Sequence, residues 1–157
     1  MKLSTKGRYG LRALIDLAQY SEEEAVSIAS IAARQNISES YLEQLVAKLK
    51  KAGLVVSIRG AQGGYRLARP ADTISVGDIL RALEGNLEAV ECSAHTDEGC
   101  QGADLCVTKY VWQRINESIA RTVDEMMLDQ LVEESKKARQ KCKGDGTVDF
   151  SRESCSG

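Results

Sequence analysis

A chain of 157 residues, with 43% hydrophobic and 28% charged residues, suits one domain or a compact domain with an extended element. No apolar run is long enough to span a membrane, and the N-terminus lacks the apolar core of a signal peptide. We therefore expect a cytoplasmic protein with reduced thiols and no membrane partner. The net charge of −2 hides an asymmetry, because residues 1–70 carry +5 and residues 71–157 carry −7. A basic half of this kind can face phosphates.

The first predicted helix covers residues 6–20, with Thr5 as its cap. A short second helix is expected to follow Ser27 and to end near Asn36, a residue type that tolerates the left-handed conformation of helix C-termini. One face of the first helix is apolar and consists of Tyr9, Ala13, Leu14, Leu17 and Ala18.

Ser38 is the predicted start of a third helix, which is expected to stop at Gly53. A capping box made by Ser40 and Glu43 would instead start this helix two residues later. Two helices joined by a short turn, the second with a polar outer face, are typical of helix-turn-helix DNA-binding domains. That outer face consists of Ser40, Tyr41, Glu43, Gln44, Ala47 and Lys48.

Two β-rich runs at residues 54–58 and 65–68 flank a glycine-rich tip at residues 59–64. Because this pattern comes directly after the helix-turn-helix, it predicts a hairpin that serves as a wing. Ser75 and Asp78 then fit a capping box and predict a further short helix.

Three cysteines gather in one polar loop, where Cys92, Cys100 and Cys106 have the spacing Cys-x7-Cys-x5-Cys. Thiols in a polar loop have no packing reason to lie together, whereas soft thiolates bind iron–sulfur clusters, zinc and copper(I). The loop follows a DNA-binding module, so we expect a regulator that senses through a metal centre. A structural zinc site that includes His95 is one alternative, although such sites favour closely spaced ligand pairs. A thiol redox switch without metal is another.

A long helix is predicted from about Leu105 to Met126, followed by a last helical piece at residues 128–141. Apolar residues recur along the long helix at helical spacing and would be exposed in a monomer. They therefore predict a partner helix from a second copy, and packing against the chain's own body is the alternative. The stripe consists of Trp112, Ile115, Ile119, Val123 and Met126.

A dimer with two-fold symmetry reads two half-sites in successive major grooves of double-stranded DNA. On the third helix, Glu43 can accept a hydrogen bond from cytosine and Gln44 can serve adenine. Ser40 and Tyr41 can hold phosphates, and Arg59 at the wing tip suits the minor groove. Further candidates for DNA contact are Gly60, Gln62 and Gly63 in the wing, and Lys2, Lys48 and Lys50.

Four segments of the chain resemble the IscR-type iron–sulfur cluster regulators of the Rrf2 family: MKLSTKGRYGLRALIDLA, ISESYLEQLVAKLKKAGLV, RGAQGGYRLAR and CQGADLCVTKYVW. The resemblance covers about residues 1–130. It implies a mainly α fold with a small β-hairpin, in which a winged helix-turn-helix DNA-binding domain is joined to a long dimerisation helix. It also implies a homodimeric repressor, sometimes an activator, of iron–sulfur cluster biogenesis genes. The cluster, usually 2Fe–2S, would change which operators are bound, and Glu43 would discriminate between operator classes.

The cluster ligands implied by the resemblance are Cys92, Cys100 and Cys106. There are two departures, because seven residues rather than five separate the first two cysteines, and Lys109 stands where the family places a histidine. His95 could supply the missing imidazole from a new place. The other options are a carboxylate from this loop or from the partner subunit, and a 4Fe–4S cluster with a non-cysteine fourth ligand.

The expected organisation has a winged helix-turn-helix domain at residues 1–85, a cluster-binding loop at 86–107, a dimerisation helix and C-terminal helix at 105–141, and a disordered tail at 142–157. The expected partners are operator DNA, a second copy and cluster-assembly proteins. The sequence shows no convincing nucleophile–base pair and no phosphate-binding loop, which argues against an enzyme. A cluster-free metabolic sensor that acts through a partner enzyme is a further alternative.

Overall fold

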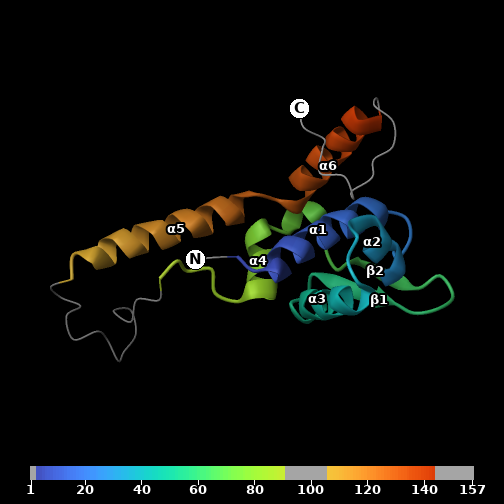
Figure 1. The fold of residues 1–157 in the computed structure, drawn as a ribbon, viewed down its shortest axis with the longest axis horizontal. Helices are drawn as coiled ribbons and strands as arrows, with labels where there is room; N and C mark the ends of the chain where they lie inside the picture. The colour runs from blue at the N-terminus through green and yellow to red at the C-terminus, as the bar shows by residue number, and fades with distance from the viewer. Residues whose placement is uncertain (1–2, 91–105, 144–157) are drawn as a thin grey trace.

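The computed structural model describes residues 3–90 and 106–143 and is mainly helical, with one small hairpin (Figure 1). This arrangement confirms the predicted fold class. The elements in chain order are α1 (Thr5–Tyr20), α2 (Ile28–Gln35), α3 (Glu39–Lys51), β1 (Val55–Ile58), β2 (Gly64–Leu67), the 3-10 helix η1 (Ala71–Thr73), α4 (Val76–Glu84), α5 (Thr108–Glu125) and α6 (Leu128–Lys143).

Short-range capping signals set most of the helix boundaries. The hydroxyls of Ser27 and Ser38 accept hydrogen bonds from the first turns of α2 and α3, and Asn36 ends α2 with a φ of 53°. The predicted capping box of Ser75 is present at α4. At α1 the prediction was wrong, because Ser4 is the cap and Thr5 is already helical. The start of α3 at Ser38 likewise rules out the alternative start two residues later.

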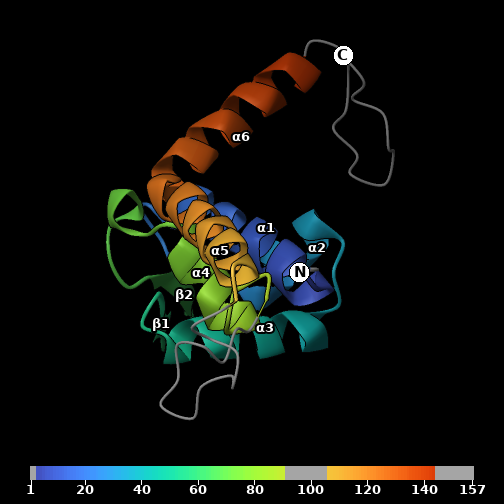
Figure 2. The same ribbon diagram turned by 90° about the vertical axis from the view of Figure 1, so that its left-hand side faces the viewer.

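The main hydrophobic core lies between α1, α2, α3, α4 and the hairpin. Its fully buried members include Leu14, Leu42, Leu45 and Ile79. The first two turns of α6 also enter this core, because Leu128 is 0% and Val132 6% exposed. Burial of side chains of this size stabilises the fold by roughly 1.5–3 kcal/mol each. In the view turned by 90°, α3 and the hairpin lie on one side of the body and α6 leaves from the opposite side (Figure 2).

The hairpin is held against the connection between α1 and α2. Strands β1 and β2 pair antiparallel, from Val55 opposite Leu67 to Ile58 opposite Gly64. On the free side of β2, the backbone N–H of Val26 donates to the carbonyl of Tyr65 (2.9 Å), and the N–H of Tyr65 donates back (2.8 Å). These two bonds fix the direction in which the wing leaves the body.

Helix α5 projects away from the body, and only its C-terminal half is packed on it (Figure 1). Ile119 and Val123 pack against the buried Val76 and Leu80 of α4. In the N-terminal half, large apolar side chains stay exposed, and Tyr110 is 63% accessible. The helix begins at Thr108, one turn later than predicted. None of the helices within residues 3–90 and 106–143 has the length and apolarity needed to cross a lipid bilayer.

A buried carboxylate joins α1 to α2. Asp16 is 1% exposed, and its oxygens accept hydrogen bonds from the guanidinium of Arg34 (2.7, 3.0 and 3.1 Å) and from the amide of Gln35 (2.8 Å). The Arg34 guanidinium also lies 4.2 Å from the centre of the Tyr20 ring. Because a buried charge is tolerated only when it is paired and hydrogen-bonded, this network holds α2 in one position on α1.

Candidate DNA interface and cysteine centre

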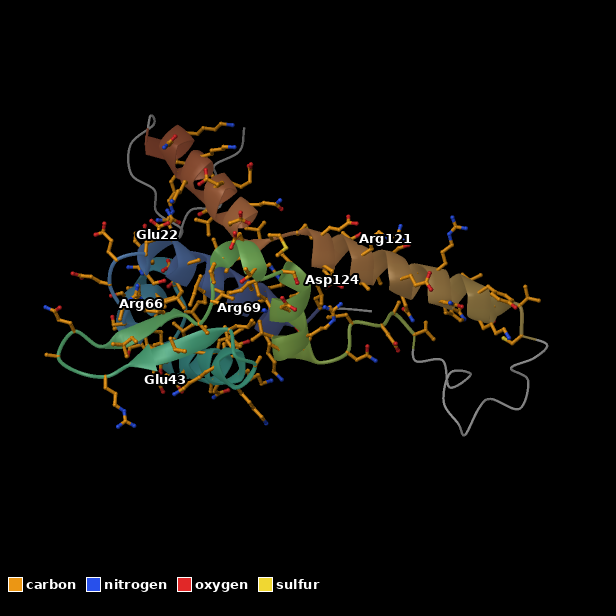
Figure 3. All side chains as sticks on the ribbon, turned by 180° about the vertical axis from the view of Figure 1, so that it is seen from behind. Glu22, Glu43, Arg66, Arg69, Arg121 and Asp124 are labelled. Atoms are coloured by element: carbon orange, nitrogen blue, oxygen red, sulfur yellow. The ribbon has the colours of Figure 1, made fainter. Side chains whose placement is uncertain are left out.

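The face of α3 that was predicted to read bases is open to solvent. Ser40, Glu43 and Gln44 are all exposed, and Glu43 lies on the side of α3 that faces away from α6 (Figure 3). Within the described chain, these three side chains make no hydrogen bond or ion pair. Their donors and acceptors are therefore available for base edges, which is the requirement for direct readout.

Two further side chains on α3 that were predicted to contact DNA, those of Tyr41 and Lys50, do have partners inside the protein. The hydroxyl of Tyr41 lies 3.2 Å from the hydroxyl of Thr5, and its half-buried ring meets the ring of Tyr9 edge to face. The ammonium of Lys50 donates to the hydroxyl of Ser57 on β1 (2.9 Å). Both contacts are exposed, so each side chain is held near the surface that would meet phosphates.

Lys48, which was also predicted to contact DNA, has a hydrogen-bond partner inside the protein. Its ammonium donates to the carbonyl of Leu83 (3.4 Å), which lies in the last turn of α4. A cation near a helix C-terminus is favourable because it meets the negative end of the helix dipole. Lys48 therefore connects the predicted recognition helix to the end of α4.

The wing tip carries Arg59, Gly60 and Gln62 on its exposed surface. Gly60 has a φ of 116°, a conformation that other residues rarely adopt. At Gly63 the space is limited by the turn itself, because an added Cβ would lie 2.5 Å from the carbonyl oxygen of Ile58. The tip thus places one arginine and one amide at the end of the hairpin.

The end of α4 is also joined to the start of α1. One carboxylate oxygen of Glu84 accepts hydrogen bonds from the backbone N–H of Ser4 (2.9 Å), the hydroxyl of Ser4 (2.6 Å) and the N–H of Gly7 (2.9 Å). Burial raises the pKa of Glu84, but these hydrogen bonds and the charge of Lys6 outweigh it, so the pKa lies below its ordinary value. The carboxylate therefore stays charged at neutral pH and stabilises the N-terminus of α1.

Of the predicted cluster ligands, the structure describes Cys106. Its thiol is free and half-buried, and lies two residues before α5. Hydrogen bonds from the hydroxyl of Thr108 (3.1 Å) and the backbone N–H of Lys109 lower the pKa of the Cys106 thiol. Cys92, His95, Cys100 and Lys2 lie outside the described residues. In residues 3–90 and 106–143 no three His, Cys, Asp or Glu side chains come together as a metal site.

The family follows from the sequence as a whole. A family model for Rrf2, described as an iron-dependent transcriptional regulator, matches residues 3–134. The chain belongs to the Rrf2 family. Curated relatives include the transcriptional regulator IscR of Aliivibrio salmonicida, which is 45% identical over 132 residues, or 84% of this chain and 77% of that protein. IscR of Pectobacterium carotovorum is 43% identical and covers 84% of this chain and 79% of its own length.

Solved structures of Rrf2 regulators have the same fold. IscR of T. potens has a TM-score of 0.70 and 47% identity, over 88% of this chain and 90% of its own. CymR of B. subtilis, a global cysteine regulator, also has a TM-score of 0.70, with 44% identity over 85% of this chain and 97% of its own. This Rrf2 protein is therefore a DNA-binding transcriptional regulator of the IscR type with a winged helix fold, and not an enzyme.

One contact beside the cysteine segment was not foreseen from the sequence of this Rrf2 regulator. The side-chain oxygen of Asn116 on α5 accepts a hydrogen bond from the N–H of Ala89 (2.8 Å), and its amide donates to the carbonyl of Val90 (3.3 Å). Asn116 lies 27 and 26 positions from these partners, so no local pattern points to them. The only sequence signal was a polar residue beside the apolar stripe of the helix.

Proposed function

We propose that this Rrf2 regulator is an iron–sulfur cluster-dependent repressor of iron–sulfur cluster biogenesis genes, and that cluster occupancy changes its operator binding. The observation that carries the proposal is the thiol of Cys106 at the start of α5, held by Thr108 in an environment that favours the thiolate. Thiolates are the usual protein ligands of iron–sulfur clusters. IscR relatives at 43–45% identity support the same reading.

The proposed ligands are Cys92, Cys100 and Cys106, with His95 as the fourth. Three soft thiolates and one weaker ligand suit a 2Fe–2S cluster that is readily lost, and a 4Fe–4S cluster is the alternative. Such a cluster would supply a signal of cluster availability through its occupancy. Lys109 is an unsuitable ligand because a lysine amine is not among the usual protein ligands of iron–sulfur clusters, which are cysteine thiolates and, less often, histidine.

We also propose that the protein acts as a homodimer on double-stranded operators. The N-terminal half of α5 exposes Tyr110 (63%), Val111 (50%) and Ile115 (38%) on a helix that extends beyond the body (Figure 1). An exposed apolar stripe of this kind is stable in water when a second helix covers it. A second copy would also supply the second recognition helix that a two-fold operator needs.

Anaerobic purification tests the cluster directly. We expect a reddish-brown protein with two iron and two sulfide per chain, and loss of the colour and iron in Cys92→Ala. Sedimentation of the same sample should give twice the chain mass of 17.1 kDa. A colourless protein that holds one zinc, or no metal after cluster reconstitution, would contradict the proposal and favour a zinc site or a thiol switch.

Base reading by α3 gives a second prediction. Because Glu43 is exposed and free of protein partners in the described chain, Glu43→Ala should reduce the preference for the operator over random DNA. One lost base contact is worth about 1–3 kcal/mol of discrimination, or roughly 5–150-fold. Lys50→Ala is the matched control, because loss of a phosphate contact weakens binding to all sequences alike. Equal losses on operator and random DNA in Glu43→Ala, measured by fluorescence anisotropy, would refute base reading by this residue.

A further inference from the structure

A cavity of about 250 Å³ lies between α1, the end of α2 and α6. Its walls include the half-buried side chains of Ile15 on α1 and Leu131 on α6, and the buried side chain of Gln35 lines it from α2. Pockets for drug-sized ligands measure about 300–1,000 Å³, so this cavity suits a smaller molecule. Because α6 leaves the body on the side opposite α3, an occupant of this cavity would leave α3 open to DNA (Figure 2).

Arg12 of α1 presents a guanidinium to this cavity. Its Nε donates to the side-chain oxygen of Gln35 (3.3 Å), and its Nη2 donates to the carbonyl of Gln35 (3.0 Å). A guanidinium has five N–H donors in a fixed fork, and no other N–H of Arg12 has a hydrogen-bond partner within the described chain. The bonds to Gln35 therefore hold the fork in one orientation while leaving donors for a ligand.

Arg139 of α6 lines the same cavity with a second guanidinium. This group donates to the hydroxyl of Tyr20 and lies 5.3 Å from the centre of the Tyr20 ring. Ser135, one turn earlier on α6, also lines the cavity, but its hydroxyl proton is donated to Gln19 (3.3 Å). The positive charge around the cavity thus comes from arginines on two different helices.

Asp16 is the one carboxylate in the wall of this cavity. Its oxygens accept hydrogen bonds from Arg34 and Gln35, so its charge is already matched by the guanidinium of Arg34. Arg12 and Arg139 therefore give the cavity an excess of positive charge. Like charges around a partly apolar space repel each other more strongly than they do in bulk water, and an anion between them would relieve this repulsion.

We propose that this cavity binds a small organic anion, with a carboxylate at one end and an apolar body. The carboxylate meets Arg12 and Arg139, because the planar fork of an arginine matches its geometry and forms charge-assisted hydrogen bonds. The apolar body contacts Ile15 and Leu131. Such a ligand would join α6 to α1 and give the regulator a small-molecule input that does not depend on the proposed cluster.

An NMR titration of the full-length protein tests this site, with isovalerate as the probe and isovaleramide as its neutral analogue of the same shape. We expect isovalerate to bind with a Kd on the order of 1 mM and to shift the methyl signals of Ile15 and Leu131. Isovaleramide should bind at least about tenfold more weakly, because the hydrogen bonds to a charged acceptor are lost. Arg12→Gln should remove the preference for the acid. Arg8→Gln is the matched control, because Arg8 is exposed one turn earlier on α1, and it should keep the preference.

Three results would overturn the proposal. Equal binding of the acid and the amide to the wild type would show that the arginines recognise no anion. Unshifted methyl signals of Ile15 and Leu131 would place the probe elsewhere. Inorganic phosphate that binds as tightly as isovalerate would show that the apolar walls contribute nothing.

A second variant covers the case in which Arg12→Gln does not fold. Arg12→Lys keeps the charge but not the fork, so it should bind isovalerate more weakly than the wild type and still prefer it to the amide. An unchanged affinity in Arg12→Lys would count against recognition of the carboxylate by the fork of Arg12.

Discussion

Replacing Asp16 with alanine is expected to lower the free energy of unfolding by about 2–3 kcal/mol, which is a factor of roughly 30–150 in the ratio of folded to unfolded protein. Asp16 is 1% exposed and accepts hydrogen bonds from Arg34 and Gln35. The substitution leaves the buried amide of Gln35 without this acceptor and the cation of Arg34 without its counter-charge. We place the loss below the upper values for broken buried pairs because the Arg34 side chain is 30% exposed and can turn to water. Urea denaturation measures the change.

Asp124→Ala is the control for this prediction. Asp124 also forms a bidentate pair, with Arg81 (2.6 and 3.0 Å), but the two side chains are 45% and 42% exposed. Water competes for such a pair, so its loss should cost about 1 kcal/mol or less. Similar losses in Asp16→Ala and Asp124→Ala would show that burial does not strengthen the pair on α1. The larger loss in Asp16→Ala should also weaken DNA binding, because the pair holds α2 and α2 positions α3.

Gly64→Ala is expected to detach the wing from the α1–α2 connection. A Cβ at this position would lie 2.5 Å from the carbonyl oxygen of Val26, 2.6 Å from its carbonyl carbon and 3.0 Å from the N–H nitrogen of Ser27. These are backbone atoms and cannot rotate away, so the two hydrogen bonds between Val26 and Tyr65 should break. Overpacking costs about 1–3 kcal/mol and each lost hydrogen bond about 1 kcal/mol.

Hydrogen exchange checks this prediction at the bonds themselves. The backbone N–H groups of Val26 and Tyr65 should exchange at least about tenfold faster in Gly64→Ala than in the wild type, because the free energy of local opening is lower. Gln62→Ala is a suitable control, since Gln62 is exposed at the wing tip and makes no hydrogen bond in the described chain. Unchanged protection of the Tyr65 N–H in Gly64→Ala would mean that the backbone accommodates the methyl group without separating the wing.

Local signals in the sequence were enough to predict most of the secondary structure. Ser27, Ser38 and Ser75 cap helices as expected because an N-cap is decided by a few neighbouring residues. The same local reasoning failed between Ser4 and Thr5, which are adjacent residues with similar hydroxyls. The choice is made by Glu84, 80 positions away, which binds both the N–H and the hydroxyl of Ser4.

The candidate site was predictable where its residues face solvent and less so where they have long-range partners. The exposed face of α3, including Glu43 and Gln44, follows from helical periodicity. The attachment of Lys48 to Leu83 and of Asn116 to Ala89 depends on how separate helices meet, which periodicity does not report. For the apolar stripe on α5, the sequence predicted a partner helix along the whole length. In the C-terminal half, however, Ile119 and Val123 pack on α4 of the same chain, so only the N-terminal half is left for a partner.

The burial of Leu128 and Val132 has a consequence for how the protein is made. These residues complete the core around α1 but are synthesised after the recognition helix, the cysteine segment and α5. Domains generally fold as units during synthesis. A nascent or truncated chain that ends before α6 therefore lacks part of the core of its own DNA-binding body. We therefore expect truncation before α6 to weaken operator binding by destabilising the DNA-binding body, although α6 leaves that body on the side opposite α3 (Figure 2).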